Sequence, residues 1–299
     1  MAVEVKKLGF DAIKTKGWLL AYKWLILRRI SQLAILVLFL LGPWFGIWIV
    51  KGNLVSSLTL DVLPLSDPYV VMQSLFAGHL MEVTAITGAL IVVAFYLLFG
   101  GRIYCSWVCP VNVITDAASW LRYKLGIKGG TQLSRNTRYW ILAMTFVIAL
   151  VTGVMAWESI NPVTILPRAI IFGSVSAWII AIAIFVFDAF VSQRGWCGHL
   201  CPVGAFYSLL TKFSLLRVNA YARKKCDDCM ECFAICPEPQ VITPALRGEE
   251  KNISSMIMSV NCTNCGRCID ICSKDVFKFD HRFNKKISIK VLHQREVLP

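Results

Sequence analysis

Four long apolar runs constrain this sequence more than any other feature. Each has about the 20 residues that a helix needs to cross a bilayer, and they lie at 30–50, 80–99, 139–157 and 169–191. Of the 299 residues, 57% are hydrophobic and 16% are charged, whereas an ordinary soluble domain has about 25% charged residues. We therefore predict an α-helical integral membrane protein with four transmembrane helices.

The basic residues alternate along the chain in step with these runs. Seven Lys and Arg precede the first run, and the segments after the four runs hold one, six, one and sixteen. Because Lys and Arg concentrate on the cytoplasmic side of a membrane, we expect a multi-pass protein with its N- and C-termini in the cytoplasm. The net charge of +13 then reflects topology and anionic lipid, and we expect no nucleic-acid partner.

Eight of the twelve cysteines form two runs near the C-terminus. Both runs have the C-x2-C-x2-C-x3-C spacing of bacterial two-cluster ferredoxins, in which the last cysteine of each run ligates the other cluster. We predict two [4Fe–4S] clusters whose iron is held by these cysteines alone. The ligands of the first are Cys226, Cys229, Cys232 and Cys272. The ligands of the second are Cys262, Cys265, Cys268 and Cys236.

Two other uses of these eight cysteines fit the spacing less well. A zinc site closes a tetrahedron with paired C-x2-C units, which would leave the third and fourth cysteines of each run idle. Disulfides are rare in the reducing cytoplasm, where the charge pattern places this segment.

The remaining four cysteines form a duplicated C-x3-C-P motif. Cys105 and Cys109 follow the second apolar run, and Cys197 and Cys201 follow the fourth, at 105–110 and 197–202. Each motif is preceded by a Gly/Arg pair, and an Asp-Pro or Asn-Pro step lies before each of the same two runs. This pattern indicates an internal repeat of a two-span unit, and such repeats often form a shared site at their interface.

The role of the motif cysteines is open at this point. Cysteines at i and i+4 share a helix face, and the following proline breaks or kinks the chain, so the two pairs can converge into one four-cysteine patch. Three functional interpretations compete: redox-active thiols, ligands of a further cluster or metal, and contacts that guide electrons to the ferredoxin segment. Packing of small residues at a tight helix end is the structural alternative.

Four spans, two C-x3-C-P motifs and a double ferredoxin run together resemble the NapH family of ferredoxin-type membrane proteins, over residues 28–272. The resemblance implies the bacterial inner membrane and the membrane component of a quinol dehydrogenase that serves periplasmic nitrate reductase; whether the chain is itself an enzyme stays open. Three partners are implied: the quinol pool, a periplasmic ferredoxin of the NapG type and a membrane-anchored multihaem c-type cytochrome. The chain has no C-x-x-C-H, so it attaches no c-type haem itself.

Other membrane ferredoxins share part of this arrangement. The CcoG-like and methylamine-utilisation proteins are similar enough that an assembly or maturation factor for a metalloenzyme is the alternative function. From the apolar runs, the charge pattern and the cysteine runs we divide the chain into a basic cytoplasmic segment (1–29), a four-span membrane domain (30–216) and a cytoplasmic ferredoxin-like domain (217–299).

Quinol oxidation requires proton acceptors, and two pairs of residues are candidates. His79 and Glu82 stand at i and i+3 near the start of the second run and share a helix face if the helix includes both. Asp188 and His199 flank the second C-x3-C-P motif. Ionisable residues at membrane depth are functional hypotheses by default, so both pairs are candidate quinol sites.

Overall fold

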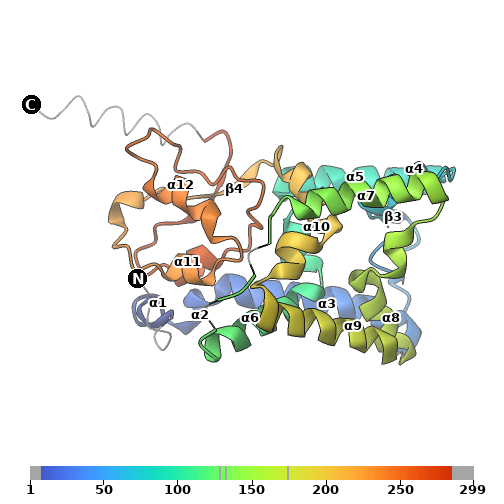
Figure 1. Ribbon diagram of the computed structural model, residues 1–299, viewed down its shortest axis with the longest axis horizontal. Coiled ribbons are helices and arrows are strands. Elements are labelled where there is room, and N and C mark those ends of the chain that lie inside the picture. Colours follow the sequence, from blue (N-terminus) through green and yellow to red (C-terminus); the bar gives the residue numbers. More distant parts are fainter. Residues whose placement is uncertain (1–7, 128, 132, 174, 285–299) are drawn as a thin grey trace, which may run out of the picture.

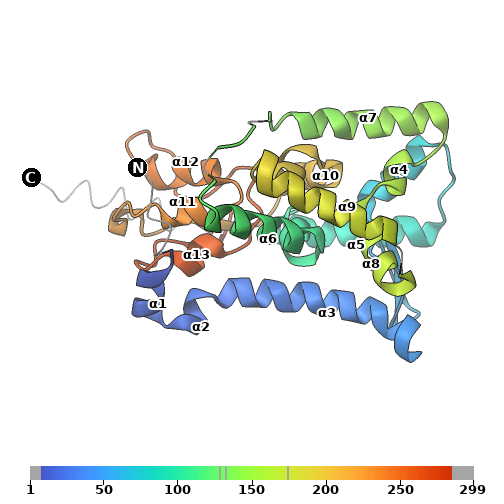
Figure 2. The same ribbon diagram turned by 60° about the horizontal axis from the view of Figure 1, so that its bottom comes forward.

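The apolar helices run along the long axis of an elongated molecule, with a cysteine-rich unit at one end (Figures 1 and 2). The computed structural model describes residues 8–127, 129–131, 133–173 and 175–284. The outer parts of the two predicted terminal segments, 1–7 and 285–299, lie outside these residues. A small sheet lies at the end opposite the cysteine-rich unit (Figure 1).

Within the described residues, one helix is long and apolar enough to cross a bilayer by itself, α3 (Lys23–Phe45). α7 (Thr137–Thr152) reaches that length only together with the segment Ala156–Ile171, across a bend of 108°. α5 (Val83–Phe99) and the helical segment Trp178–Val191 are apolar but shorter. Each predicted run therefore contains an apolar helix, with bounds that differ from the prediction.

The first run forms one helix that ends earlier than we predicted, and the fourth run is divided between two helices. α3 ends where Gly46 takes a φ of 74°. In the fourth run, α8 (Pro162–Phe172) stops at Gly173, whose φ is 67°, and a separate helix, α9 (Val175–Val186), follows. The left-handed conformation is readily available to glycine and commonly ends helices. Both glycines thus interrupt helices that apolar composition alone would extend.

The connection after α3 forms a sheet that the sequence analysis did not anticipate. It is an antiparallel meander of β1 (Val50–Gly52), β2 (Ser56–Thr59) and β3 (Leu63–Ser66). Ser57 of β2 is in register with Gly52 on one side and Leu65 on the other. β3 packs on α5, so the sheet closes the end of the helical part.

The helical part has two halves, which correspond to the two copies of the internal repeat. Each half begins with a short helix, and the two helices have the same type of cap. α4 (Pro68–Phe76) and α8 both start with proline, which suits the first position of a helix. Asp67 caps α4 by accepting the Tyr69 N–H at 3.0 Å, and Asn161 caps α8 by accepting the Val163 N–H at 3.1 Å. The Asp-Pro and Asn-Pro steps of the sequence are therefore helix N-caps.

Each half then continues through an apolar helix to a π-helical turn. In the first half α5 leads to the turn η2 (Tyr104–Val108) and to α6 (Val111–Lys124). In the second half α9 is extended by η4 (Phe187–Val191) and leads to η5 (Trp196–Leu200) and α10 (Pro202–Thr211). A 3-10 turn, η3 (Ala156–Ser159), links α7 to α8.

The cysteine-rich unit is built around two short helices that pack on each other, α11 (Glu231–Ile235) and α13 (Arg267–Ile271). Its remaining elements are η6 (Arg223–Lys225), η7 (Pro239–Val241), α12 (Ile242–Arg247) and the antiparallel strands β4 (Leu216–Asn219) and β5 (Lys278–His281). The buried side chains of Val218, Ile242 and Ile271 belong to its apolar core.

The N-terminal segment is docked on this unit through α1 (Phe10–Lys16) and α2 (Trp18–Ala21). The first N–H groups of a helix have no partner within the helix. At the start of α3, the Asp270 carboxylate accepts the N–H groups of Trp24 and Leu25, each at 3.1 Å. The cysteine-rich unit therefore caps the longest apolar helix.

Candidate functional site

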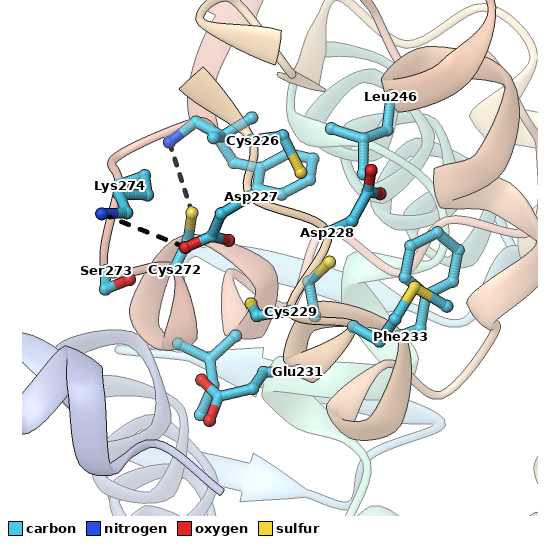
Figure 3. A pocket seen from close by; sticks show the side chains of 15 residues that line it. Cys226, Asp227, Asp228, Cys229, Glu231, Phe233, Leu246, Cys272, Ser273 and Lys274 are labelled. Carbon is cyan, nitrogen blue, oxygen red and sulfur yellow. Dashed lines mark hydrogen bonds and ion pairs between the residues drawn. The ribbon is translucent and has the colours of Figure 1, made fainter. Parts of the chain in front are cut away.

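The eight ferredoxin-type cysteines line two pockets in the cysteine-rich unit. The first pocket is lined by Cys226, Cys229, Cys232 and Cys272. Figure 3 shows the sulfur atoms of Cys226, Cys229 and Cys272 turned toward the same space. The second pocket is lined by Cys236, Cys262, Cys265 and Cys268. The structure thus groups the cysteines into the same two sets of four that the spacing predicts.

Two short helices produce this exchange of the fourth cysteine. Cys232 lies within α11 and lines the first pocket, whereas Cys236 follows the end of α11 in extended conformation and lines the second. Cys268 and Cys272 stand in the same relation to α13, with the pockets reversed. Because α11 and α13 pack on each other, the cysteine that follows each helix lines the pocket beside the other helix.

The loops between the cysteines turn backbone N–H groups toward sulfur. Residues at equivalent loop positions are left-handed: Asp228 and Met230 in the first loop, Asn264 and Gly266 in the second. Burial raises the thiol pKa of Cys226, Cys229 and Cys262, and the nearby backbone N–H groups of Asp228, Glu231 and Asn264 act in the opposite direction. The Val276 N–H lies 3.4 Å from the Cys272 sulfur.

These features fit an iron–sulfur cluster in each pocket. Four thiols surround each space, and N–H donors are already aimed at several of the sulfurs, as the negative charge of a thiolate-bound cluster requires. Within the described residues, no three His, Cys, Asp or Glu side chains converge as ligands of a single metal ion.

The four motif cysteines also come together, although in a different local conformation from the expected α-helical face. Each motif is a π-helical turn closed by a hydrogen bond from the second cysteine: Cys109 N to Tyr104 O and Cys201 N to Trp196 O, both at 3.0 Å. As predicted, the helical turn breaks before each proline, since Cys109 and Cys201 are in extended conformation. The prolines then begin the next helices: Pro202 is the first residue of α10, and Pro110 precedes α6. π-Helical turns are frequent at functional sites.

The four motif cysteines meet at one apolar cluster between the two halves: Cys109 is buried within it, and Cys105, Cys197 and Cys201 are partly buried and pack against it. Beside it, a cavity is lined by the first cysteine of each motif, Cys105 and Cys197, and by Arg28, Arg102 and Arg194. The guanidinium groups of Arg28 and Arg102 are buried and that of Arg194 is partly buried, and cations beside thiols suit a site that carries negative charge. Arg102 also has a buried Nε without a hydrogen-bond partner among the described residues.

The same cavity shares lining residues with the second ferredoxin pocket. Its other wall is formed by Pro237, Glu238 and Thr263, and Glu238 and Thr263 also line the pocket of Cys236 and Cys262. Arg102 bridges the two, because it donates to Glu238 Oε1 at 3.2 Å and lies 3.4 Å from the Cys197 carbonyl oxygen. The motif cavity thus neighbours the second ferredoxin pocket, which neighbours the first through the packed helices α11 and α13, so the three cysteine groups follow one another.

Glu238 is the centre of the charge network at this junction. Its buried carboxylate accepts hydrogen bonds from Arg102, from Arg135 at 2.9 Å and from Gln240 at 2.7 Å, and Arg138 lies 3.9 Å away. Burial alone would raise the pKa of Glu238, but Arg102, Gln240 and Arg135 hold it below its ordinary value. The carboxylate is therefore the charged partner of these arginines.

A second charge network holds Arg194, the arginine that precedes the second C-x3-C-P motif. Asp116 of α6 is bonded by Arg194 at 2.7 Å, by Arg28 at 3.1 Å and by Arg29. Burial alone would raise the pKa of Asp116, but the three arginines lower it to about 2. The sequence shows Arg102 and Arg194 only as part of the repeat, and it does not indicate Glu238 or Asp116, because their partners are distant in sequence.

The four candidate quinol-site residues have separate surroundings. His79 Nε2 lies 3.1 Å from the Gly153 carbonyl oxygen, while the Glu82 carboxylate accepts the Thr84 hydroxyl at 3.1 Å. Asp188 is fully buried and accepts the Trp196 N–H at 2.9 Å, so it caps the second motif turn. His199 has a buried Nδ1 without a hydrogen-bond partner among the described residues.

Comparison with known proteins gives two family matches. Residues 82–128 and 175–220 match a family model described as a 4Fe-4S binding domain, and residues 225–276 match a 4Fe-4S dicluster domain. The first match covers both C-x3-C-P motifs and the second covers both ferredoxin runs. No solved structure matches the chain.

Curated relatives extend along nearly the whole chain. The ferredoxin-type protein NapH of Haemophilus influenzae is 46% identical over 95% of this chain and 99% of its own. NapH of Escherichia coli is 43% identical over 95% of this chain and 98% of its own. The methylamine utilization ferredoxin-type protein MauN of Paracoccus denitrificans is 52% identical over 84% of this chain and 88% of its own. The chain therefore belongs to the family of ferredoxin-type iron–sulfur proteins that includes NapH and MauN.

Proposed function

We propose that this protein is the membrane component of a quinol dehydrogenase, which passes electrons from the quinol pool toward a periplasmic nitrate reductase. The observation that carries the proposal is the series of three cysteine groups, which begins among the apolar helices and ends in the ferredoxin-like unit. A [4Fe–4S] cluster supplies one-electron transfer when bound. NapH relatives over 95% of the chain support a place in a nitrate reductase system.

The membrane part of the proposal is a four-pass protein of the bacterial inner membrane with both termini in the cytoplasm. The alternation of basic residues supports this orientation, as do four apolar helical segments that run along one axis (Figure 2). The proposed domains are the segment 1–29, the membrane domain 30–216 and the ferredoxin-like domain 217–299. The proposed partners are a NapG-type periplasmic ferredoxin and a membrane-anchored multihaem c-type cytochrome.

We assign the four cysteines of the C-x3-C-P motifs to a third iron–sulfur site. The match of both motif segments to a 4Fe-4S binding domain supports this assignment, as do the shared cavity and its three arginines. Cys105, Cys109, Cys197 and Cys201 would hold this group, and Cys226, Cys229, Cys232, Cys272, Cys236, Cys262, Cys265 and Cys268 would hold the other two. Arg28, Arg102 and Arg194 would offset its negative charge.

Iron content and electron paramagnetic resonance test the proposal. Three cubane sites predict about twelve iron atoms per chain, and the variant with serine at the four motif cysteines should hold about eight while keeping the ferredoxin signals. Reduced menaquinol or ubiquinol should then reduce the clusters of the wild-type protein in membranes. An iron content of about eight in the wild type would remove the third site, and clusters that quinol leaves oxidised, with partners present, would refute the quinol-linked function.

The MauN relatives favour a second candidate function, a maturation factor for a metalloenzyme. Quinol reduction of the clusters and the effect of deleting the protein separate the two functions. A maturation factor needs no reduction by quinol, and its loss should leave the target enzyme present but inactive. A quinol dehydrogenase component should instead leave a fully assembled reductase that receives no electrons.

A further inference from the structure

A large cavity lies outside the two ferredoxin pockets, at the junction of the helical part and the cysteine-rich unit. Its volume is about 450 Å³, within the range of sites that bind small organic molecules. It lies among α3, α5, η2, β4 and β5, with Ile35 of α3 on one side and Leu216 of β4 on another. The candidate residues His79, Glu82, Asp188 and His199 do not line it.

The lining is aromatic, with a few polar groups. Five aromatic rings surround the space in addition to Tyr96, and they belong to Trp24, Phe95, Phe99, Trp107 and Phe279. Trp24 lies between two of them, with its ring centroid 4.8 Å from Phe279 and 6.2 Å from Trp107. The hydroxyl-bearing side chains are Ser31 and Tyr96, and the Ser31 hydroxyl donates to the Trp107 carbonyl at 3.0 Å, which leaves its oxygen able to accept.

Two cysteine sites border this cavity. Trp107 and Val108 lie inside the C-x3-C turn between Cys105 and Cys109. On the other side Asn264 belongs to the loop between Cys262 and Cys265, and its side chain amide donates to the carbonyls of Phe99 and Leu216 at 3.2 and 3.0 Å. The Trp107 indole donates to the Asn264 backbone carbonyl at 3.2 Å. A ligand here would lie beside both cysteine sites.

Access to the cavity is from an apolar surface. Phe95 and Phe99 are 49% and 44% exposed, and Leu98 next to them is 51% exposed. On α3 the exposed neighbours are Ile30 and Leu33, at 56% and 62%. In the proposed topology this surface faces lipid, so the ligand has to be lipid-soluble.

We propose that this cavity binds the ring of a membrane quinone or quinol. An aromatic cavity with two hydroxyl side chains, entered from lipid and bordered by two cysteine sites, suits a flat redox-active ring with polar oxygens. The inference rests on the proposed quinol-linked function and adds its location. It assigns no direction to electron flow. The cavity takes the place of both candidate pairs from the sequence, His79 with Glu82 and Asp188 with His199, as the proposed quinol site.

Photolabelling of the full-length protein in phosphatidylethanolamine and phosphatidylglycerol nanodiscs tests the location. A photoreactive azidoquinone should label peptides that contain residues 24–35 and 95–108, and decylubiquinone or menadione should displace it. Ile35→Trp places an indole in the cavity and should lower labelling at least tenfold. Leu33→Trp, on the outer face of the same helix, is the matched control and should leave labelling within twofold.

A second measurement does not depend on a cavity-filling variant. Quinones quench nearby indole fluorescence, so decylubiquinone should quench the wild type saturably, and the Trp24→Phe, Trp107→Phe double variant should lose most of that quenching. Trp140→Phe removes an indole that is 72% exposed on α7 and should not change the saturable component. Iron content and the dithionite-reduced spectrum establish that each variant is folded.

The outcomes separate the site from the function. Displaceable label at residues 79–82 or 188–199 would overturn the site and leave the quinol-linked function standing. Label spread along all apolar helices and not displaced by quinone would mean that the cavity holds only lipid chains, and would also overturn the site. Displaceable label at the cavity in a protein whose clusters quinol cannot reduce would support the site and refute the function.

Discussion

Replacement of Glu238 by glutamine tests the junction between the helical part and the cysteine-rich unit. The carboxylate is 4% exposed and meets Arg102 at 3.2 Å and Arg138 at 3.9 Å, which are 2% and 0% exposed. Removal of one partner from a buried ion pair costs about 3–5 kcal/mol, because the remaining charge stays buried without compensation. Glutamine keeps one acceptor oxygen, so we expect a loss of about 3 kcal/mol.

Thermal unfolding in detergent measures this loss, followed by bleaching of the iron–sulfur absorbance and by near-ultraviolet circular dichroism. At roughly 2 °C per kcal/mol for a chain of this size, the midpoint should fall by about 6 °C. Glu249→Gln is the matched control, because that carboxylate is 34% exposed and pairs with Arg223 at 3.2 Å. A partly exposed pair contributes at most about 1 kcal/mol.

The reasoning fails if both variants shift the midpoint equally. A double variant gives an independent check. Arg102→Gln combined with Glu238→Gln removes both charges of the pair, so its destabilisation should be smaller than the sum of the two single losses. Strictly additive losses would mean that the two residues do not act as a charge pair.

Three further predictions concern other charged or strained residues. The pKa of Asp116 is lowered from 3.8 to about 2, which stabilises the folded protein by about 2 kcal/mol above pH 4, and this stabilisation is lost as the pH falls through 2. In a pH series of unfolding midpoints, the wild type should show this decline and Asp116→Asn should not. An equal decline in both proteins would exclude Asp116 as its source. Met230 has a φ of 62° where the second loop has Gly266, so Met230→Gly should raise the midpoint by the equivalent of about 1 kcal/mol, and a lower midpoint would contradict the strain. Asp270→Ala removes the cap of α3 at a cost of about 1–2 kcal/mol, so limited proteolysis should cut residues 8–22 faster than in the wild type, and an unchanged rate would show that the cap does not hold this segment.

The sequence was most informative where chemistry depends on local spacing. The C-x2-C-x2-C-x3-C runs predicted which cysteines share a pocket, because the loop and the short helix between them are fixed by neighbouring residues. The length and composition of the apolar runs predicted four transmembrane helices; each run contains an apolar helical segment, and among the described residues α3 alone has spanning length by itself. Their bounds were less accurate, because Gly46 and Gly173 end helices through backbone conformation, which hydropathy does not report.

Features that depend on contacts distant in sequence were not predicted. Arg102 and Glu238 are separated by 136 residues, and nothing near either one indicates the other. The cavity beside Trp107 is likewise formed by segments from across the chain. The π-helical turns were missed for a different reason: the i,i+4 spacing of the cysteines is compatible with α and π geometry alike, and only the hydrogen bond of Cys109 to Tyr104 distinguishes them.

The cap of α3 has a consequence for biosynthesis. Asp270 is 246 residues from Trp24, and at about 5–20 residues per second the ribosome needs roughly 12–50 s to make the intervening chain. In the proposed topology, the first apolar helix would therefore enter the membrane before Asp270 is made to cap it and before α1 and α2 can dock on the cysteine-rich unit. Cys268 of α13 and Cys272, which follows that helix, flank Asp270 in the sequence. Delivery of iron and sulfide to the finished chain would therefore also fix its earliest segment, and exposure of residues 8–22 would mark molecules that still lack their clusters.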